Sequence, residues 1–366
     1  MSRPRFRVFP PLSPTVYARR RRAELPFPLD DPRCRTFALA RHGLLRGVEG
    51  LGLRPGDEVL APAYHHGSEV EVYVRAGLAP RFYDATDTLE PDPDELDRAL
   101  GERVRALHLI HYLGFPSDAA RWRRWCDERG LFLIEDAAQA WLARRDGVAV
   151  GSLGDLAIFS LYKSVGVPDG GAVVASAPLP SPGGRRRLAA RRVAKAHRSW
   201  LAQRSPALAT PRSARPAPER DGLPPGEFSL GDPSSPASPL TRAMIPRLLR
   251  DDVAGRRRLN YASLLKRLGG FVPRPFAELH PGASPFAFPV AVRDKRSLLD
   301  ALTDAGVRAL DLWSIPHPSL TVERFPGAAR RRRSTIGLPI HQELSPIHVD
   351  AIAAVVSDHL DSSGAR

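Results

Sequence analysis

Cysteine and long apolar runs are scarce in this chain of 366 residues. Only Cys34 and Cys126 are present, which supports neither a disulfide framework nor a cysteine-based zinc site, and we expect no metal. The apolar runs, such as 131–134 and 171–175, are far shorter than the ~20 residues that a membrane span needs. No apolar segment follows the basic N-terminus, so no signal peptide is expected. These absences favour a cytoplasmic protein without a membrane partner.

Lysine is also rare, although the formal net charge is +14. Among 54 basic residues the lysines are only Lys163, Lys195, Lys266 and Lys295. Arginine stays protonated and is not a nucleophile, so a retained lysine is suited to covalent chemistry that arginine cannot perform. The arginines are scattered, and no zinc-finger spacing or RNA-binding aromatic pattern accompanies them. Composition therefore argues against a nucleic-acid partner and favours an anionic small-molecule substrate.

Helical and strand patterns alternate over 31–176, which predicts a large domain with a mostly parallel sheet covered on both faces. Helices are expected at 36–51 and 67–76, from an Asp92 cap onward, and from a Ser117 cap to Arg129. Strands are expected at 58–63, 80–84, 103–111, 131–134, 156–161 and 171–176. Ligand groups in such sheets lie at the carboxyl ends of strands, where Asp136 and Ser160 fall.

The remaining segments differ in composition. Residues 1–30 read as an irregular N-terminal arm rich in proline and arginine. Residues 177–240 read as an insertion or surface loop, because nine prolines lie between Pro206 and Pro239. Residues 241–366 are expected to form a small C-terminal α/β domain, with helical periodicity at 240–268, a strand at 286–292, and helices at 295–305 and 346–360.

Segment 131–171 holds the residue types that bind pyridoxal 5'-phosphate (PLP). The pyridine nitrogen needs a carboxylate partner to stay protonated, and Asp136 follows a strand. The aldehyde needs an amine, which Lys163 offers, and the phosphate needs hydroxyl and backbone N–H donors, to which Ser160 contributes.

The same segment resembles the DegT/StrS-type aminotransferases, which transaminate nucleotide-linked keto-sugars. Blocks similar to those of the family occur in order at 54–59, 111–114, 135–140, 151–155, 159–160, 163, 169–171 and 337–342. Such dispersed, ordered blocks are far more specific than any single motif. The resemblance implies an α/β PLP-transferase of fold type I, with a large mostly parallel-sheet domain and a smaller C-terminal domain. It also implies a homodimer, glutamate as amino donor and a sugar nucleotide as acceptor.

The resemblance assigns a role to each matching residue. Lys163 is implied to carry PLP as a Schiff base and to act as general acid–base, while Asp136 keeps the ring nitrogen protonated. Gln139 is implied to contact the cofactor phenolate or the substrate. Members that deoxygenate sugars carry His at the lysine position, so Lys163 favours transamination. The remaining cofactor contacts implied by matching positions are Ala40, Arg41, His66 and Ser160.

Three departures from the family pattern bear on this reading. The phosphate-binding Ser-Gly-Thr turn of the family is replaced by Leu39, Ala40 and Arg41. His66 stands at the position where an aromatic residue of the family usually stacks on the pyridine ring. The family's Asn-Tyr-Arg motif is not found before Leu240. Two alternatives stay open: another PLP reaction on the same fold, and a non-catalytic homologue acting as a binding or regulatory protein.

Two further motifs are weaker. Residues 160–163 spell S-x-x-K, the acylating motif of penicillin-recognising enzymes, but its partner motifs S-D-N and K-T-G are missing. His108 and His111 are expected on one strand with opposite facing, so they do not form a convincing metal pair.

Overall fold

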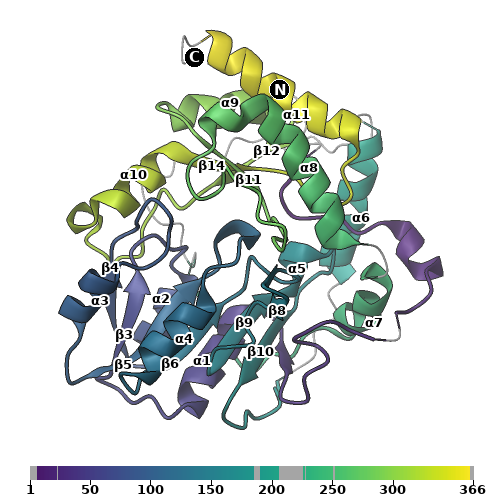
Figure 1. The fold of residues 1–366 in the computed structure, drawn as a ribbon. Coiled ribbons are helices and arrows are strands. Elements are labelled where there is room, and N and C mark those ends of the chain that lie inside the picture. The colour runs from purple at the N-terminus through teal and green to yellow at the C-terminus, as the bar shows by residue number, and fades with distance from the viewer. Residues whose placement is uncertain are drawn as a thin grey trace.

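A large sheet-containing unit and a smaller C-terminal unit make up the computed structural model of the chain (Figure 1). The structure describes residues 6–22, 24–184, 190–205, 226, 228–249 and 252–362. Within them, seven strands form a sheet in the order β2-β10-β9-β6-β5-β3-β4. In that order, the strands are Arg35–Phe37, Gly171–Ala175, Leu156–Ser160, Phe132–Asp136, Val104–Ile110, Glu58–Pro62 and Ala79–Tyr83. β10 is antiparallel to both β9 and β2, and the other neighbours are parallel, so the predicted mostly parallel α/β sheet is confirmed.

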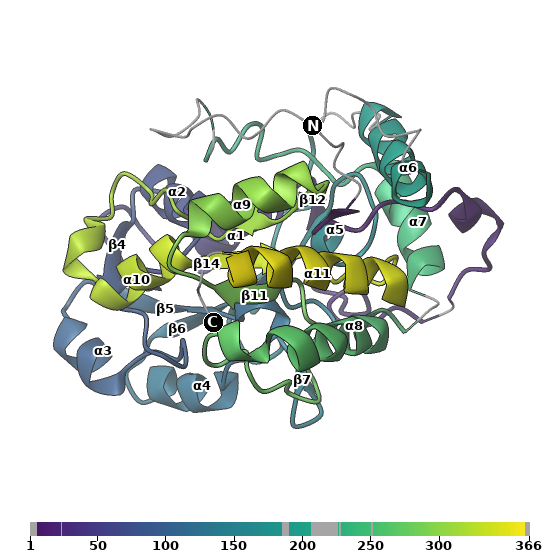
Figure 2. The same ribbon diagram turned by 90° about the horizontal axis from the view of Figure 1, so that it is seen from above.

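Helices cover both faces of this sheet, and the alternation of side chains along each strand explains why. On β5, Ala106 packs with α1 and α2, while the next residue, Leu107, packs with α3 and α4. Figure 2 shows α1 and α2 on one side of β5 and β6, and α3 and α4 on the other. A strand buried on both faces is mostly apolar, which is why these strands contain short hydrophobic runs in the sequence. The helices are α1 (Ala40–Gly50), α2 (Ser68–Arg75), α3 (Pro93–Ala99), α4 (Ala119–Asp127) and the short α5 (Leu161–Ser164).

Two helix starts differ from the expectation. The helix expected at 36–51 begins only at Ala40, because residues 35–37 pair with β10 as the edge strand β2. The cap of α4 is Asp118, whose side chain accepts a hydrogen bond from the Arg121 amide, rather than Ser117. The Ser117 hydroxyl instead donates to the Ile110 carbonyl at the end of β5. The Asp92 cap of α3 is confirmed.

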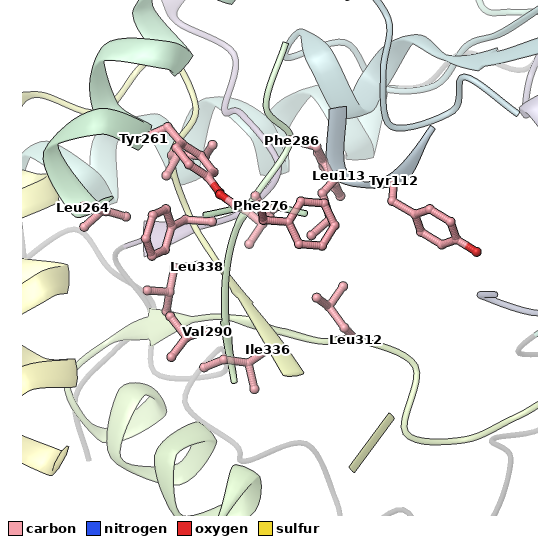
Figure 3. Close-up of a cluster of buried hydrophobic side chains, with 14 of the residues drawn as sticks. Tyr112, Leu113, Tyr261, Leu264, Phe276, Phe286, Val290, Leu312, Ile336 and Leu338 are labelled. Atoms are coloured by element: carbon pink, nitrogen blue, oxygen red, sulfur yellow. The ribbon is translucent and has the colours of Figure 1, made fainter. Parts of the chain in front are cut away.

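The C-terminal unit packs its helices on a small antiparallel sheet of order β11-β14-β13. Its core joins Tyr261 and Leu264 of α8 with the sheet residues Val290, Ile336 and Leu338 (Figure 3). The region expected to be helical over 240–268 is two helices, and the stretch between 305 and 346 contains α10 and β14, which the sequence did not predict. The elements are α7 (Pro239–Leu248), α8 (Val253–Leu268), β11 (Phe288–Ala291), α9 (Lys295–Asp304), β12 (Val307–Arg308), β13 (Leu310–Asp311), α10 (Pro326–Ser334), β14 (Thr335–Leu338) and α11 (Pro346–Ser362).

A backbone seam joins the two units. The amides of Ser284 and Phe286 donate to the carbonyls of Gly114 and Leu113, at 3.0 and 2.7 Å. Gly114 has a φ of +90°, and a Cβ there would collide with the Ser284 carbonyl, so glycine is required for this approach. Leu113 and Tyr112, which follow β5, contribute side chains to the core of the C-terminal unit (Figure 3).

The N-terminal arm is more ordered than its composition indicated. β1 (Phe6–Arg7) pairs in parallel with β12, and Phe6, Val8, Leu12 and Val16 are buried. Within the segment expected to be a loop, residues 190–204 form helix α6 (Ala190–Arg204). The proline-rich stretch at 206–225 lies outside the described residues, and the proposed division into 1–30, 31–176, 177–240 and 241–366 remains a prediction. The short remaining elements are β7 (Arg144–Arg145), β8 (Val148–Ala149) and the 3-10 turns Pro14–Ala18, Tyr112–Gly114, Gly269–Phe271 and Val322–Arg324.

Candidate active site

A cavity of about 640 Å³ lies at the carboxyl ends of β6 and β9, where α1 and α5 begin. Every residue that the sequence singled out for the site lines this one cavity: Ala40, Arg41, His66, Asp136, Gln139, Ser160 and Lys163. They come from four separate stretches of the chain, so the fold, and not sequence proximity alone, brings them together. The roles given to them remain proposals.

Asp136 is the last residue of β6 and only 8% exposed. Its Oδ1 accepts a hydrogen bond from the Ala138 amide at 2.8 Å, and its Oδ2 lies 3.7 Å from His108 Nε2. Burial alone would raise the pKa of Asp136, but the influence of His108, of Lys163 and of the Ala138 amide outweighs burial and lowers the pKa. The carboxylate is therefore held ionised at the cavity wall.

Gln139 is positioned by the strand end of β5. Its Oε1 accepts a hydrogen bond from the Leu113 amide at 2.9 Å, which leaves its amide nitrogen to face a ligand as a donor. Residues 138–142, directly after β6, form a turn. The turn places Gln139 in the cavity wall beside Asp136.

Lys163 lies on α5, directly after β9, with its Nζ 5.8 Å from the centre of the Phe286 ring. Its backbone is fixed by Arg257, a fully buried residue of α8 that the sequence analysis missed. The Arg257 guanidinium donates to the carbonyls of Lys163 at 3.0 Å and Ser164 at 2.8 Å. Burial lowers the pKa of Arg257 to about 9. An arginine that is distant in the sequence thus holds the backbone of α5, which carries the Lys163 amine.

Ser160 and the start of α1 form another part of the cavity lining. Ser160 is buried and precedes α5 without using its hydroxyl as a cap. Leu39 precedes α1 and provides no side-chain cap, and the first turn of this helix brings Ala40 and Arg41 into the cavity wall. Gly171 of β10 packs against this turn, and a Cβ there would collide with the Ala40 nitrogen.

Residues 31–179 match the sequence model of the DegT/DnrJ/EryC1/StrS aminotransferase family. This segment belongs to that family. Within it lie all seven residues of the predicted site.

Relatives and solved structures extend the comparison. The chain is 38% identical over 142 residues to dTDP-3-amino-3,4,6-trideoxy-alpha-D-glucose transaminase of Streptomyces venezuelae; the match covers 36% of this chain and 36% of that relative. The aminotransferase TlmJ from Streptoalloteichus hindustanus aligns with a TM-score of 0.66 and 24% identity, covering 90% of this chain and 86% of TlmJ. DesV of S. venezuelae, solved in complex with a ketimine intermediate, aligns with a TM-score of 0.64 and 23% identity. The alignment covers 89% of this chain and 84% of DesV. The fold is therefore that of the aminotransferases over nearly the whole chain.

Part of the family's sequence signature is structural in this chain. Glu135 is fully buried and accepts hydrogen bonds from His111 Nε2 and from the amides of Gly151, Leu153 and Gly154. Burial would raise the pKa of Glu135, but His111 and these amides lower it. The 135–140 and 151–155 blocks are thus joined through one carboxylate that does not line the cavity.

The acidic residue of the 169–171 block is structural as well. Asp169 Oδ1 accepts from the Thr241 hydroxyl at 2.6 Å and from the Ser238 amide at 3.1 Å, which anchors the start of α7. The glycine that follows in this block, Gly171, makes the close approach to α1 described above.

His66 lines the cavity in the aminotransferase-family segment, but its ring is engaged with the protein. Its ring meets Phe228 edge-on with centres 6.0 Å apart, and its amide donates to Glu69 Oε1 at 3.1 Å. Whether it also stacks on a ligand ring remains a prediction.

The mouth of the cavity is cationic. Arg7, Lys195 and Arg308 line it, and Arg7 is the register partner of Arg308 in the β1–β12 pair. Burial, followed by the charge of Arg308, lowers the pKa of Arg7. Burial, followed by the charges of Arg7 and Arg308, lowers the pKa of Lys195. Among the described residues, no carboxylate forms an ion pair with these three cations, whereas the lining carboxylates Asp300 and Asp311 are paired with Arg296 and Lys295.

Proposed function

We propose that the protein is a PLP-dependent aminotransferase that moves an amino group from glutamate to a nucleotide-linked keto-sugar. The observation that carries this proposal is the convergence of Lys163, Asp136 and Gln139 on one cavity with an amide-rich helix start. The donor set fits PLP: an ionised carboxylate for the ring nitrogen, an amide donor for the phenolate, and an amine for the aldehyde. Ser160 and the amides of α1 supply donors for the phosphate.

The chain's own residues then have distinct tasks. When bound, PLP supplies an electron sink that stabilises negative charge on the substrate carbon. Asp136 would keep the proton on the ring nitrogen, and Gln139 Nε2 would donate to the phenolate oxygen. Lys163 would hold the cofactor through its Nζ amine, and as a free amine it would take the proton from the donor Cα as a general base. Arg257 keeps the backbone of Lys163 in place during both tasks.

The cationic mouth supports an acceptor that carries phosphate. Like charges that face one cavity without carboxylate partners repel one another, and an anionic ligand relieves that cost. The diphosphate of a sugar nucleotide has the charge and size for this place. We expect Arg308→Ala to weaken binding of dTDP, GDP or UDP about tenfold, the effect of one charge-assisted contact, in calorimetric titration. Arg324→Ala, an exposed arginine that does not line the cavity, serves as the matched control.

Covalent labelling tests the cofactor assignment. We expect the purified protein to be yellow and borohydride reduction to fix the cofactor to Lys163, as mapped by peptide mass spectrometry. A colourless protein that takes up no added PLP, or a label on Lys195, Lys266 or Lys295, contradicts the proposal.

Product analysis separates the alternatives. Transamination predicts that glutamate is converted to 2-oxoglutarate and that the bound cofactor keeps the amino group until a keto-sugar nucleotide is added. Elimination or decarboxylation would release other products from the amino acid. A protein that binds PLP but turns over no amino donor supports the non-catalytic alternative, in which it acts as a binding or regulatory partner. The cytoplasmic location and the homodimer remain part of this proposal.

A further inference from the structure

Tyr73, His108 and Asp136 form a buried polar chain that runs from α2 through β5 to the cavity. Tyr73 and His108 are both 0% exposed, and only Asp136 reaches the cavity wall. The Tyr73 hydroxyl lies 2.6 Å from His108 Nδ1, and His108 Nε2 lies 3.7 Å from Asp136 Oδ2. Tyr73 and His108 have no role of their own in the proposed reaction.

The position of His108 between Tyr73 and Asp136 limits which of its ring nitrogens carry protons. If the phenol donates to Nδ1, the neutral ring carries its proton on Nε2, facing the Asp136 carboxylate. If the ring is charged, both nitrogens carry protons, and Nε2–H again faces Asp136. The remaining tautomer would turn a lone pair toward a carboxylate in a buried place, which is unfavourable. In both acceptable states the carboxylate receives an N–H group.

The 3.7 Å separation is longer than a hydrogen bond, and His108 Nε2 has no hydrogen-bond partner although it is buried. A buried N–H without a partner costs free energy, so the imidazole favours any arrangement that brings the Asp136 oxygen closer. The other oxygen is already fixed by the Ala138 amide. The carboxylate is therefore anchored by a hydrogen bond at Oδ1, while its Oδ2 faces the imidazole N–H across a short gap.

We propose that His108 is a positioning residue that, fixed by Tyr73, orients the Asp136 carboxylate toward the ring nitrogen of the cofactor. The inference rests on the proposed function, since it concerns the same cofactor site. Burial and then the charge of Asp136 raise the pKa of Tyr73, so the phenol keeps the proton that it donates. The other titratable groups around this chain are Tyr83, whose hydroxyl donates to the His108 carbonyl, together with His65, Glu69 and Lys163.

A pair of cofactor forms tests the proposal without relying on activity. PLP has the ring nitrogen that Asp136 would meet, and 1-deaza-PLP carries a C–H group there but is otherwise the same. The dissociation constants of both are measured by fluorescence titration of the full-length, cofactor-free protein. We expect His108→Leu to weaken PLP binding about tenfold, the effect of one charge-assisted contact, and to leave 1-deaza-PLP binding within about twofold.

Three other variants sharpen the comparison. His108→Gln keeps an N–H donor and is expected to restore much of the PLP affinity. Tyr73→Phe releases the imidazole and is expected to act in the same direction as His108→Leu. Tyr83→Phe is the matched control: it removes another buried hydroxyl bonded to residue 108, but at the backbone carbonyl, and it should leave the ratio of the two constants unchanged.

Equal weakening of both cofactor forms by His108→Leu would show that His108 is merely structural and would overturn the proposal. The same holds if Tyr83→Phe changes the ratio as much as Tyr73→Phe does. If the unmodified protein binds neither form, the proposed function itself fails, and that result is distinct from the other two.

Discussion

At the scale of single residues, Asp136 combines burial with a charge. A carboxylate that is 8% exposed keeps its ionised form only because His108, Lys163 and the Ala138 amide face it. An asparagine in its place keeps the shape and can still hydrogen-bond, but it cannot hold a proton on the ring nitrogen.

We therefore expect Asp136→Asn to retain bound PLP but to lose turnover by about two orders of magnitude or more, in the range seen for loss of a positioned proton-transfer group. The loss should fall on kcat more than on KM, as measured by steady-state production of 2-oxoglutarate. Near-normal kcat in this variant would mean that Asp136 serves only to close the turn after β6.

His341 predicts how stability depends on pH. It is fully buried, and burial followed by the charge of Arg257 lowers its pKa from 6.5 to about 3. The unfolded chain binds a proton at this residue below about 6.5, whereas the folded chain does not until about 3, so stability is lost as pH falls through that window. Urea unfolding at neutral pH and near pH 5 should show a lower free energy of unfolding in acid. His341→Gln should reduce that difference; an unchanged pH dependence would exclude His341 as its source.

At the scale of elements, the sequence predicted those whose burial leaves a pattern. The strands β3, β5 and β6 are largely apolar, and Asp92–Pro93 marks the start of α3. Helix α10 was not predicted because it has no apolar stripe. It is held by Arg331 and Arg332, whose buried guanidinium groups donate to backbone carbonyls. Strand β1 was not predicted because its two residues are too few to show the alternation of a strand.

The site residues also divide into those that the sequence predicted and those that it did not. Asp136, Gln139, Ser160 and Lys163 lie within one short segment in a recognisable order, so sequence placed them in the cavity. Arg257 and His108 reach the site from other elements, and a buried arginine or histidine carries no mark in the sequence that separates it from an exposed one.

Gly171 tests whether the approach of β10 to α1 matters for binding. We expect Gly171→Ala to push the first turn of α1 away, to weaken PLP binding by about tenfold, and to cost about 1–3 kcal/mol of stability through overpacking. Fluorescence titration and urea unfolding measure the two effects. Gly270→Ala is the control, because a Cβ there meets open space. If both variants bind PLP equally well, the start of α1 does not hold the phosphate.

At the scale of the whole molecule, assembly is the main question. Phe228, a large apolar residue from the segment expected to be a loop, is buried against His66 and His317 in the same chain. It therefore gives no support for an interface. Phe9 at 40% and Tyr17 at 50% exposure in the N-terminal arm still offer apolar surface. Of the described helices, none is long and apolar enough to cross a membrane.

We predict a homodimer with its active sites at or near the interface, because a closed two-fold contact is the commonest way to cover such surface. Light scattering at micromolar concentration should give twice the 40.1 kDa mass of the chain. A mass equal to that of one chain would rule the dimer out and would leave the cavity complete within a single subunit.

The backbone seam at Gly114 and Ser284 has a consequence for the choice of ligand. Hydrogen bonds between main chains do not change with side-chain identity, so the spacing of the two units is set by the fold and is shared by every variant that keeps the glycine. Phe286, whose amide belongs to the seam, also lines the cavity, so this part of the cavity wall is held by the main chain. A different acceptor can then be accommodated by exchanging lining side chains such as Arg7 and Arg308, which lie outside the seam, without disturbing these main-chain hydrogen bonds.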